Sequence, residues 1–159
     1  MFEKTTYAGD LAAQYTLLSK QLAALLEGET DHMAILSNAS ALLNQFLNDV
    51  NWCGFYLYKN DELLLGPFQG LPACVHIPIG RGVCGTAAKT METQLVKDVH
   101  AFPGHIACDA ATNSEIVVPL SKDGALFGVL DIDSPSTGRF DETDRDGIEL
   151  FARTLEKYL

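Results

Sequence analysis

The chain has 159 residues, 47% of them apolar, and 21 acidic against 11 basic side chains give it a formal net charge of -10. This size and composition predict one globular domain over residues 1–159 with a full hydrophobic core. No Lys- or Arg-rich cluster is present to neutralise phosphates, and no apolar run approaches the ~18 residues of a membrane span, so neither nucleic acid nor a membrane is an expected partner.

Two apolar stripes at helical spacing open the chain. The first includes Leu11, Leu18 and Leu25 and stops at Gly28. The second runs from Ile35 to Phe46 and follows Asp31, a residue type that caps helices. These patterns predict two amphipathic helices that pack together or cover a sheet.

From Trp52 the pattern changes to that of strands. WCGFYLYK and ELLLGPFQ flank Asn60-Asp61 and predict a hairpin, and Pro67 should move the second strand to an edge or a bulge. VHIPI and QLVKDV are two further strand candidates. GRGVCGTAAKT lies between them and is typical of a turn that opens a short helix.

The last third of the chain predicts a loop, a hairpin and a helix. Residues 100–114 show no period and form a long loop, a length that usually serves a function. EIVVPL and ALFGVLDID flank Lys122-Asp123-Gly124, a strong hairpin signal, and Asp141 can cap a helix that ends near Tyr158. Together the elements predict an α+β domain with helices packed on one face of an antiparallel sheet.

Three acids are expected to converge at one end of this sheet. Strand alternation puts Phe127, Val129, Asp131 and Asp133 on one face, and Glu115 begins the neighbouring strand at the same end. Crowded carboxylates repel one another, so at least one of them keeps its proton near neutral pH and can act as an acid.

The cysteines differ in their settings. The start, MFEKTTYAGD, lacks the features of a signal peptide, which predicts a cytoplasmic protein with reduced thiols. Cys53 lies in an apolar strand pattern and is expected to be buried. Cys84 is expected near a helix N-terminus, which lowers a thiol pKa, although glycine-lined packing explains it equally well. Cys74 precedes a strand and Cys108 lies in the long loop, positions from which a thiol can move.

Such thiols indicate either thiol redox chemistry or a zinc site completed by His76 or His105. No CxxC or other tight metal-ligand spacing is present in the sequence. We therefore favour redox chemistry and expect no metal.

Three stretches, PFQGLPACVHIPIGRGVCGTAA, HIACDAATNSEIVVPL and GVLDIDSP, resemble the signatures of the free methionine-(R)-sulfoxide reductases. These enzymes are single GAF domains that reduce the unbound amino acid rather than residues of a protein. The resemblance runs through nearly the whole chain. It implies a GAF-like domain with a central antiparallel sheet, the N-terminal and C-terminal helices on one face, and a loop-rich ligand pocket on the other.

The resemblance also implies roles for three cysteines. Cys108 is expected to attack the sulfoxide sulfur, release methionine and become a sulfenic acid. Cys84 or Cys74 then condenses with it into a disulfide that thioredoxin reduces, with NADPH as the electron source through thioredoxin reductase. An exchange of roles between Cys84 and Cys108 stays open. No bound cofactor is expected, and the loop that carries Cys108 should move during the cycle.

Glu115, Asp131 and Asp133 match the family's substrate-binding acids, and Trp52 and Tyr56 are expected to enclose the methyl end of the substrate. A sulfoxide is a poor electrophile until its oxygen gains a proton, which the crowded acids can supply. They can also pair with the ammonium of a free amino acid, a group that a residue inside a polypeptide lacks. Their cost is a less acidic Cys108 thiol.

Two other functions fit parts of the sequence. A non-catalytic GAF module that senses a small ligand keeps the pocket but needs no group of three thiols. A zinc-dependent hydrolase with Cys and His ligands predicts bound metal. The amphipathic N-terminal helices could also supply the surface of a homodimer.

Overall fold

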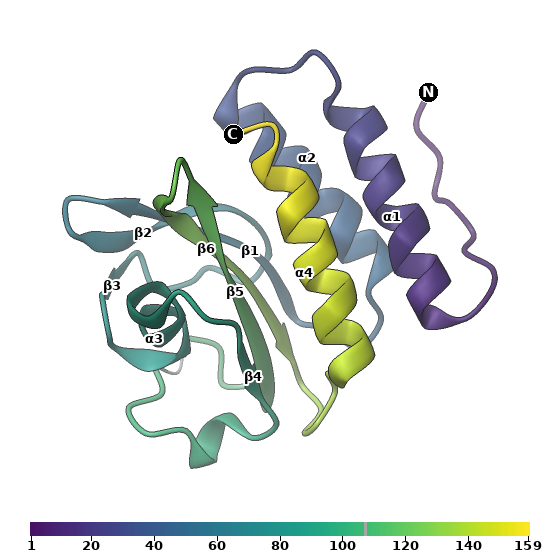
Figure 1. Cartoon of the computed structure of the whole chain (residues 1–159). Helices are drawn as coiled ribbons and strands as arrows, with labels where there is room; N and C mark the ends of the chain where they lie inside the picture. The colour runs from purple at the N-terminus through teal and green to yellow at the C-terminus, as the bar shows by residue number, and fades with distance from the viewer. Residues whose placement is uncertain (107) are drawn as a thin grey trace.

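The computed structural model describes residues 1–106 and 108–159, and it has an antiparallel sheet with helices on both faces (Figure 1). The helices are α1 (Leu11–Leu26), α2 (His32–Phe46), α3 (Gly82–Thr90) and α4 (Glu142–Glu156), with a 3-10 turn at Val99–Ala101. The strands are β1 (Trp52–Lys59), β2 (Glu62–Gly70), β3 (His76–Pro78), β4 (Gln94–Val96), β5 (Ser114–Lys122) and β6 (Ala125–Ser134). The elements predicted from the sequence are thus all present.

The six strands lie in the order β3-β2-β1-β6-β5-β4, so β1, β6 and β5 form the centre of the sheet. Helices α1, α2 and α4 lie side by side on one face, while α3 and the long loop that follows β4 lie on the other (Figure 1). The main core is therefore between the three long helices and the sheet, and a second apolar cluster lies under α3. This arrangement confirms the α+β fold with helices on one face and a loop-rich region on the other.

Local side-chain chemistry sets the helix starts as expected. The Asp31 side chain accepts a hydrogen bond from the Ala34 N–H at 3.0 Å, and Asp141 and Asp144 form a reciprocal capping box at the start of α4. The Asp144 carboxylate also accepts a hydrogen bond from the Tyr15 hydroxyl at 2.7 Å, which ties α1 to α4.

The two hairpin turns use left-handed backbone. Asn60 and Asp61 have φ of 52° and 61°, and Asp123 and Gly124 have φ of 53° and 78°. The register of β1 against β2 shifts between Gly54 and Tyr56, which places a bulge beside Pro67 as predicted.

One detail of the predicted alternation is wrong. The pairing of β5 with β6 shifts between Leu120 and Ser121, which leaves Phe127 as an extra residue on β6. Phe127 therefore packs with the helix-side core, whereas Val129 lies on the opposite face with the acids. The alternation holds from Gly128 to the end of β6.

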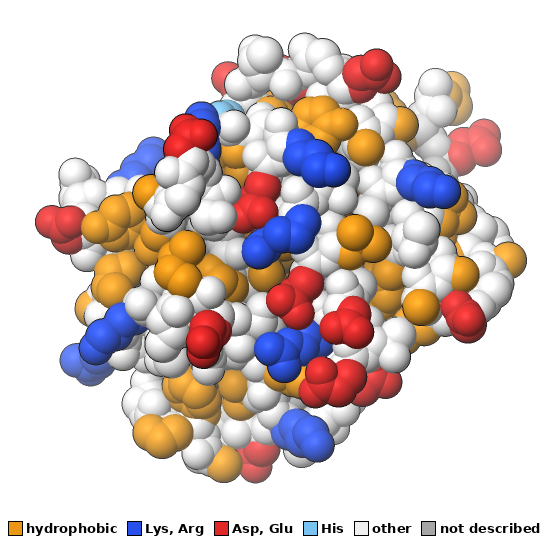
Figure 2. Space-filling view, in the orientation of Figure 1, with side chains coloured by type: hydrophobic (Ala, Val, Ile, Leu, Met, Phe, Trp, Pro, Cys, Tyr) orange, Lys and Arg blue, Asp and Glu red, His pale blue; other side chains and the backbone are white. Residues whose placement is uncertain are grey.

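The surface carries charges of both signs. On the face in Figure 2, Lys and Arg side chains lie among Asp and Glu side chains rather than in one basic patch. In the described part of the chain, no helix has both the length and the apolar character needed to cross a membrane.

Candidate active site

Three carboxyl groups gather at one end of the sheet, on the face opposite α1, α2 and α4. In the β5–β6 ladder Glu115 lies directly opposite Asp133, and Val117 lies opposite Asp131, so the three acids share a face. Glu115 is 6% exposed and Asp131 is 5% exposed. Strand register thus brings together residues that are up to 18 positions apart.

Burial raises the pKa of all three acids, and repulsion by neighbouring carboxylates adds to the rise for Glu115 and Asp133. The pKa of Glu115 lies well above its usual value because the group is buried and because Asp131 and Asp133 add negative charge. Burial and Asp131 raise the pKa of Asp133 in the same way. Burial also raises the pKa of Asp131, although hydrogen bonds from Glu115 and Cys84 partly offset the rise. All three shifts favour the protonated form of the group over the fully ionised one.

A shared proton also resolves the hydrogen bonding of the group. The Oδ1 atoms of Asp131 and Asp133 are buried and have no hydrogen-bond partner among the described residues. A proton on one carboxyl lets it donate to its neighbour. We call Glu115, Asp131 and Asp133 the acid cluster.

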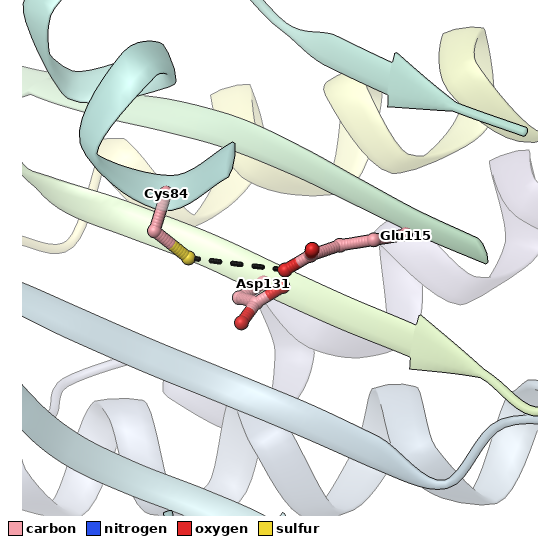
Figure 3. Close-up of side chains that lie close together, drawn as sticks. All are labelled: Cys84, Glu115 and Asp131. Carbon is pink, nitrogen blue, oxygen red and sulfur yellow. Dashed lines mark hydrogen bonds between the residues drawn. The ribbon is translucent and has the colours of Figure 1, made fainter. Parts of the chain in front are cut away.

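Cys84 reaches the acid cluster from α3. Figure 3 shows its side chain pointing toward Glu115 and Asp131, with its Sγ 4.0 Å from Glu115 Oε2. The sequence left two interpretations of this cysteine open, a thiol pKa lowered by a helix N-terminus and glycine-lined packing. Cys84 does lie in the first turn of α3, but burial, Asp131 and Glu115 raise its pKa well above the usual value. It is therefore a neutral thiol that can donate to a carboxylate.

The other two pocket cysteines are bonded to each other. Cys74 and Cys108 form a disulfide with their Cα atoms 5.7 Å apart, a usual separation for such a bond. Cys108 is exposed and Cys74 is half-buried, whereas Cys53 and Cys84 are free and buried. Of the two candidate partners for Cys108, the structure thus places Cys74 in contact with it.

Aromatic rings form one wall of the pocket. Trp52 stacks on Tyr56 at 5.7 Å between ring centroids and on Phe68 at 5.1 Å. The Tyr56 hydroxyl donates to the carbonyl oxygen of Cys74 at 2.9 Å. The wall is therefore bonded to the backbone of one of the two disulfide-linked cysteines.

One pocket combines these groups. The pocket is lined by Trp52, Tyr56, Cys84, Cys108, Glu115, Asp131 and Asp133, and Cys74 is joined to it through its disulfide with Cys108. Every candidate site residue thus lies in the pocket or beside it.

Sequence reasoning considered His105 only as a zinc ligand. Its Nε2 lies 3.8 Å from Glu115 Oε1, and burial followed by the nearby His100 lowers its pKa, so the imidazole is neutral at neutral pH. His76 lies elsewhere, on edge strand β3 beside Glu62. The loop has no period that could have placed His105 beside an acid.

Within residues 1–106 and 108–159, Cys84, Glu115 and Asp131 form the group best placed to hold a metal. Their sulfur and oxygen atoms lie within 4.8 Å of one another. A thiolate and two carboxylates suit zinc, so elemental analysis of the purified protein is the direct test of that alternative.

The chain is similar to known proteins over most of its length. The GAF domain family matches residues 31–159. The free methionine-R-sulfoxide reductase of Escherichia coli is 54% identical over 145 residues, which cover 91% of this chain and 88% of that protein.

Two solved structures are similar over almost the whole length. The reduced form of fRMsr of Staphylococcus aureus has a TM-score of 0.89 and 61% identity, with 91% of this chain and 94% of that one covered. The free methionine-R-sulfoxide reductase from Neisseria meningitidis in complex with its substrate has a TM-score of 0.93 and 46% identity, with coverages of 99% and 95%. The chain belongs to the GAF domain family and, within it, to the free methionine-R-sulfoxide reductases.

Proposed function

We propose that the chain reduces free methionine-R-sulfoxide to methionine with cysteine thiols as the reductant. The observation that carries this proposal is the pocket itself, where a buried acid cluster lies beside a cysteine that already forms a disulfide. Membership of the reductase family supports the substrate and its stereochemistry.

In the first step the Cys108 sulfur attacks the sulfoxide sulfur while the acid cluster protonates the sulfoxide oxygen. The oxygen is transferred to Cys108, which becomes a sulfenic acid, and methionine is released. Protonation by a buried acid fits the raised pKa of Glu115 and Asp133. A thiol of ordinary pKa still keeps a few per cent of thiolate at neutral pH, which is sufficient for a sulfur nucleophile.

In the second step the Cys74 thiol attacks the sulfenic sulfur of Cys108, and water leaves. The sum is one sulfoxide and two thiols converted to one sulfide, one disulfide and one water. We assign the resolving role to Cys74 because it is the residue bonded to Cys108. Cys84 then serves the pocket as a hydrogen-bond donor to the acid cluster.

Recognition of the free amino acid follows from charge and shape. Ionised members of the acid cluster pair with the substrate ammonium, and the faces of Trp52 and Tyr56 enclose the methyl end. A methionine sulfoxide within a polypeptide lacks the ammonium group and is bound less well.

We propose thioredoxin as the reductant of the exposed disulfide, with NADPH as the source of electrons through thioredoxin reductase, and no bound cofactor. Regeneration by thioredoxin suits a cytoplasmic protein. We further propose that residues 1–159 act as one GAF domain, because Tyr15 of α1 bonds to Asp144 of α4. We also propose that the chain forms a homodimer through its N-terminal helices.

The test is a coupled assay in which thioredoxin and its reductase consume NADPH in the presence of free methionine-R-sulfoxide. Cys108→Ser should abolish turnover, Cys74→Ser should stop after one methionine per protein, and Cys84→Ser should keep cycling at a reduced rate. A Cys84→Ser variant that stops after one turnover, with Cys74→Ser cycling normally, would reverse the assignment. A module that only senses a ligand would bind the sulfoxide without consuming NADPH.

The acid cluster is tested separately with Asp131→Asn and Asp133→Asn. Both variants should lower turnover and weaken substrate binding. Unchanged values in both would rule out the role proposed for these acids.

A further inference from the structure

Asn51, the residue before β1, connects the Cys108 loop to the sheet. Its Nδ2 donates to Asp109 Oδ2 at 2.9 Å and to Thr112 Oγ1 at 3.0 Å. A primary amide nitrogen carries two N–H groups, so one side chain holds two acceptors of the same loop. We call this three-residue contact the Asn51 latch.

Both ends of the Asn51 latch are themselves fixed. The Asn51 backbone N–H donates to the Asp133 carbonyl oxygen at 2.9 Å, which places the amide at the acid end of β6. On the loop side, Asp109 Oδ1 accepts from the Ala111 N–H at 2.8 Å, and the Thr112 N–H donates to the Asp109 carbonyl at 3.2 Å. Residues 109–112 therefore form a closed turn that the latch holds as a unit.

This geometry explains why an acid follows Cys108 directly in the sequence. Each Asp109 oxygen accepts a hydrogen bond, one from Asn51 and one within its own turn. The side chain therefore serves to anchor the loop. Because Asp109 is covalently joined to Cys108, the anchor also limits where the Cys108 sulfur can go.

We propose that Asn51 is a positioning residue, which keeps Cys108 beside the acid cluster by fastening Asp109 and Thr112 to the end of the sheet. The inference rests on the proposed function, in which Cys108 must meet first the substrate sulfur and then Cys74. Misplacing a reacting group by about 1 Å can cost on the order of 100-fold in rate. Asn51 is not among the residues that line the pocket, and it acts through Asp109.

The test begins with Asn51→Ala and Asn51→Asp. The first removes both donors, and the second places a carboxylate against the carboxylate of Asp109. We expect kcat to fall roughly 10- to 100-fold, while KM changes less than about threefold because the acid cluster and the aromatic wall still bind the substrate. A loss confined to KM, or an unchanged kcat in both variants, would overturn the inference.

Recovery of kcat in a double variant distinguishes loss of the Asn51 latch from a general loss of structure. In the double variant Asn51→Asp with Asp109→Asn, the new amide at 109 donates to the new carboxylate at 51, the Thr112 hydroxyl can donate to the same carboxylate, and the charge of the site is kept. The pair should recover at least about tenfold of the kcat lost in Asn51→Asp. Failure to recover any kcat would contradict the latch.

Two further variants distinguish loss of the Asn51 latch from misfolding and from a general loosening of the loop. Thr112→Val removes one acceptor and leaves Asn51 intact, so a smaller fall in kcat is expected. Asn113→Ala is the matched control, because the Asn113 amide donates to the Pro135 carbonyl at 2.7 Å, outside the latch. Equal losses in Asn51→Ala and Asn113→Ala would overturn the assignment to Asn51.

A readout without sulfoxide distinguishes failure of the latch from failure of the proposed function. Hydrogen peroxide oxidises the reduced Cys108 thiolate to a sulfenic acid, and Cys74 then closes the disulfide with release of water. Thiol alkylation followed by mass spectrometry measures this closure, which should be at least about tenfold slower in Asn51→Ala. If closure is slow in Asn51→Ala but the wild type does not turn over the sulfoxide, the positioning role of Asn51 is supported and the proposed reductase function is refuted. Closure at the wild-type rate would refute the latch.

Discussion

Replacing Glu115 by Gln should stabilise the protein at neutral pH while it removes most of the proposed activity. Glutamine keeps the shape of glutamic acid and can still donate a hydrogen bond to Asp131 or Asp133. Glutamine cannot, however, act as the acid that protonates the sulfoxide oxygen. The substitution therefore separates the chemical role of the carboxyl from its role in packing.

The size of the effect follows from the raised pKa of Glu115. Above the ordinary glutamate pKa of about 4.5 the unfolded chain releases this proton, while the folded protein keeps it. Stability therefore falls as pH rises toward the folded pKa, by about 1.4 kcal/mol per pH unit. The Gln variant does not titrate here and escapes this loss.

Urea unfolding of wild type and Glu115→Gln at several pH values between 4.5 and 7 measures the difference. The free energy of unfolding of the variant minus that of the wild type should increase steadily as pH rises. A constant offset between the two proteins would reflect packing alone. Parallel curves over this range would refute the claim that Glu115 holds its proton. Turnover at neutral pH should fall on the order of 100-fold or more in the same variant.

Three other substitutions test separate parts of the structure. Cys74→Ser should leave a sulfenic acid on Cys108 that a sulfenic-acid-specific reagent traps after one turnover, whereas a wild-type yield of disulfide would contradict this. Tyr56→Phe removes the hydrogen bond to the Cys74 carbonyl, worth about 1 kcal/mol, and should slow disulfide closure severalfold in the alkylation assay. Gly147→Ala should lower stability by roughly 2 kcal/mol or more in thermal unfolding, because the added Cβ would lie 2.1 Å from the Tyr15 ring, and an unchanged Tm would contradict that packing.

Much of the fold could be predicted from the sequence because its signals are local. Asp31 and Asp141 cap helices through bonds to residues three positions away, and Lys122-Asp123-Gly124 sets a turn by its own backbone preferences. The meeting of Glu115 with Asp133 could also be predicted, because a hairpin turn fixes the register of its two strands.

The misplaced details depend on tertiary contacts. The bulge at Phe127 carries no local signal, so the alternation failed at that residue. Cys84 was correctly placed at a helix start, but its pKa depends on burial against Asp131 and Glu115. In the same way, the bond between Asn51 and Asp109 joins residues 58 positions apart through a loop without a period, which no pattern in the sequence predicts.

Infrared spectroscopy of the reduced, substrate-free protein at neutral pH shows whether the acid cluster holds a proton. A protonated carboxyl has a C=O stretch that is separate from the bands of carboxylates. We expect such a band at pH 7, and we expect Glu115→Gln to remove or shift it. A spectrum with no protonated carboxyl at pH 7 would contradict the proposal that the acid cluster supplies the proton.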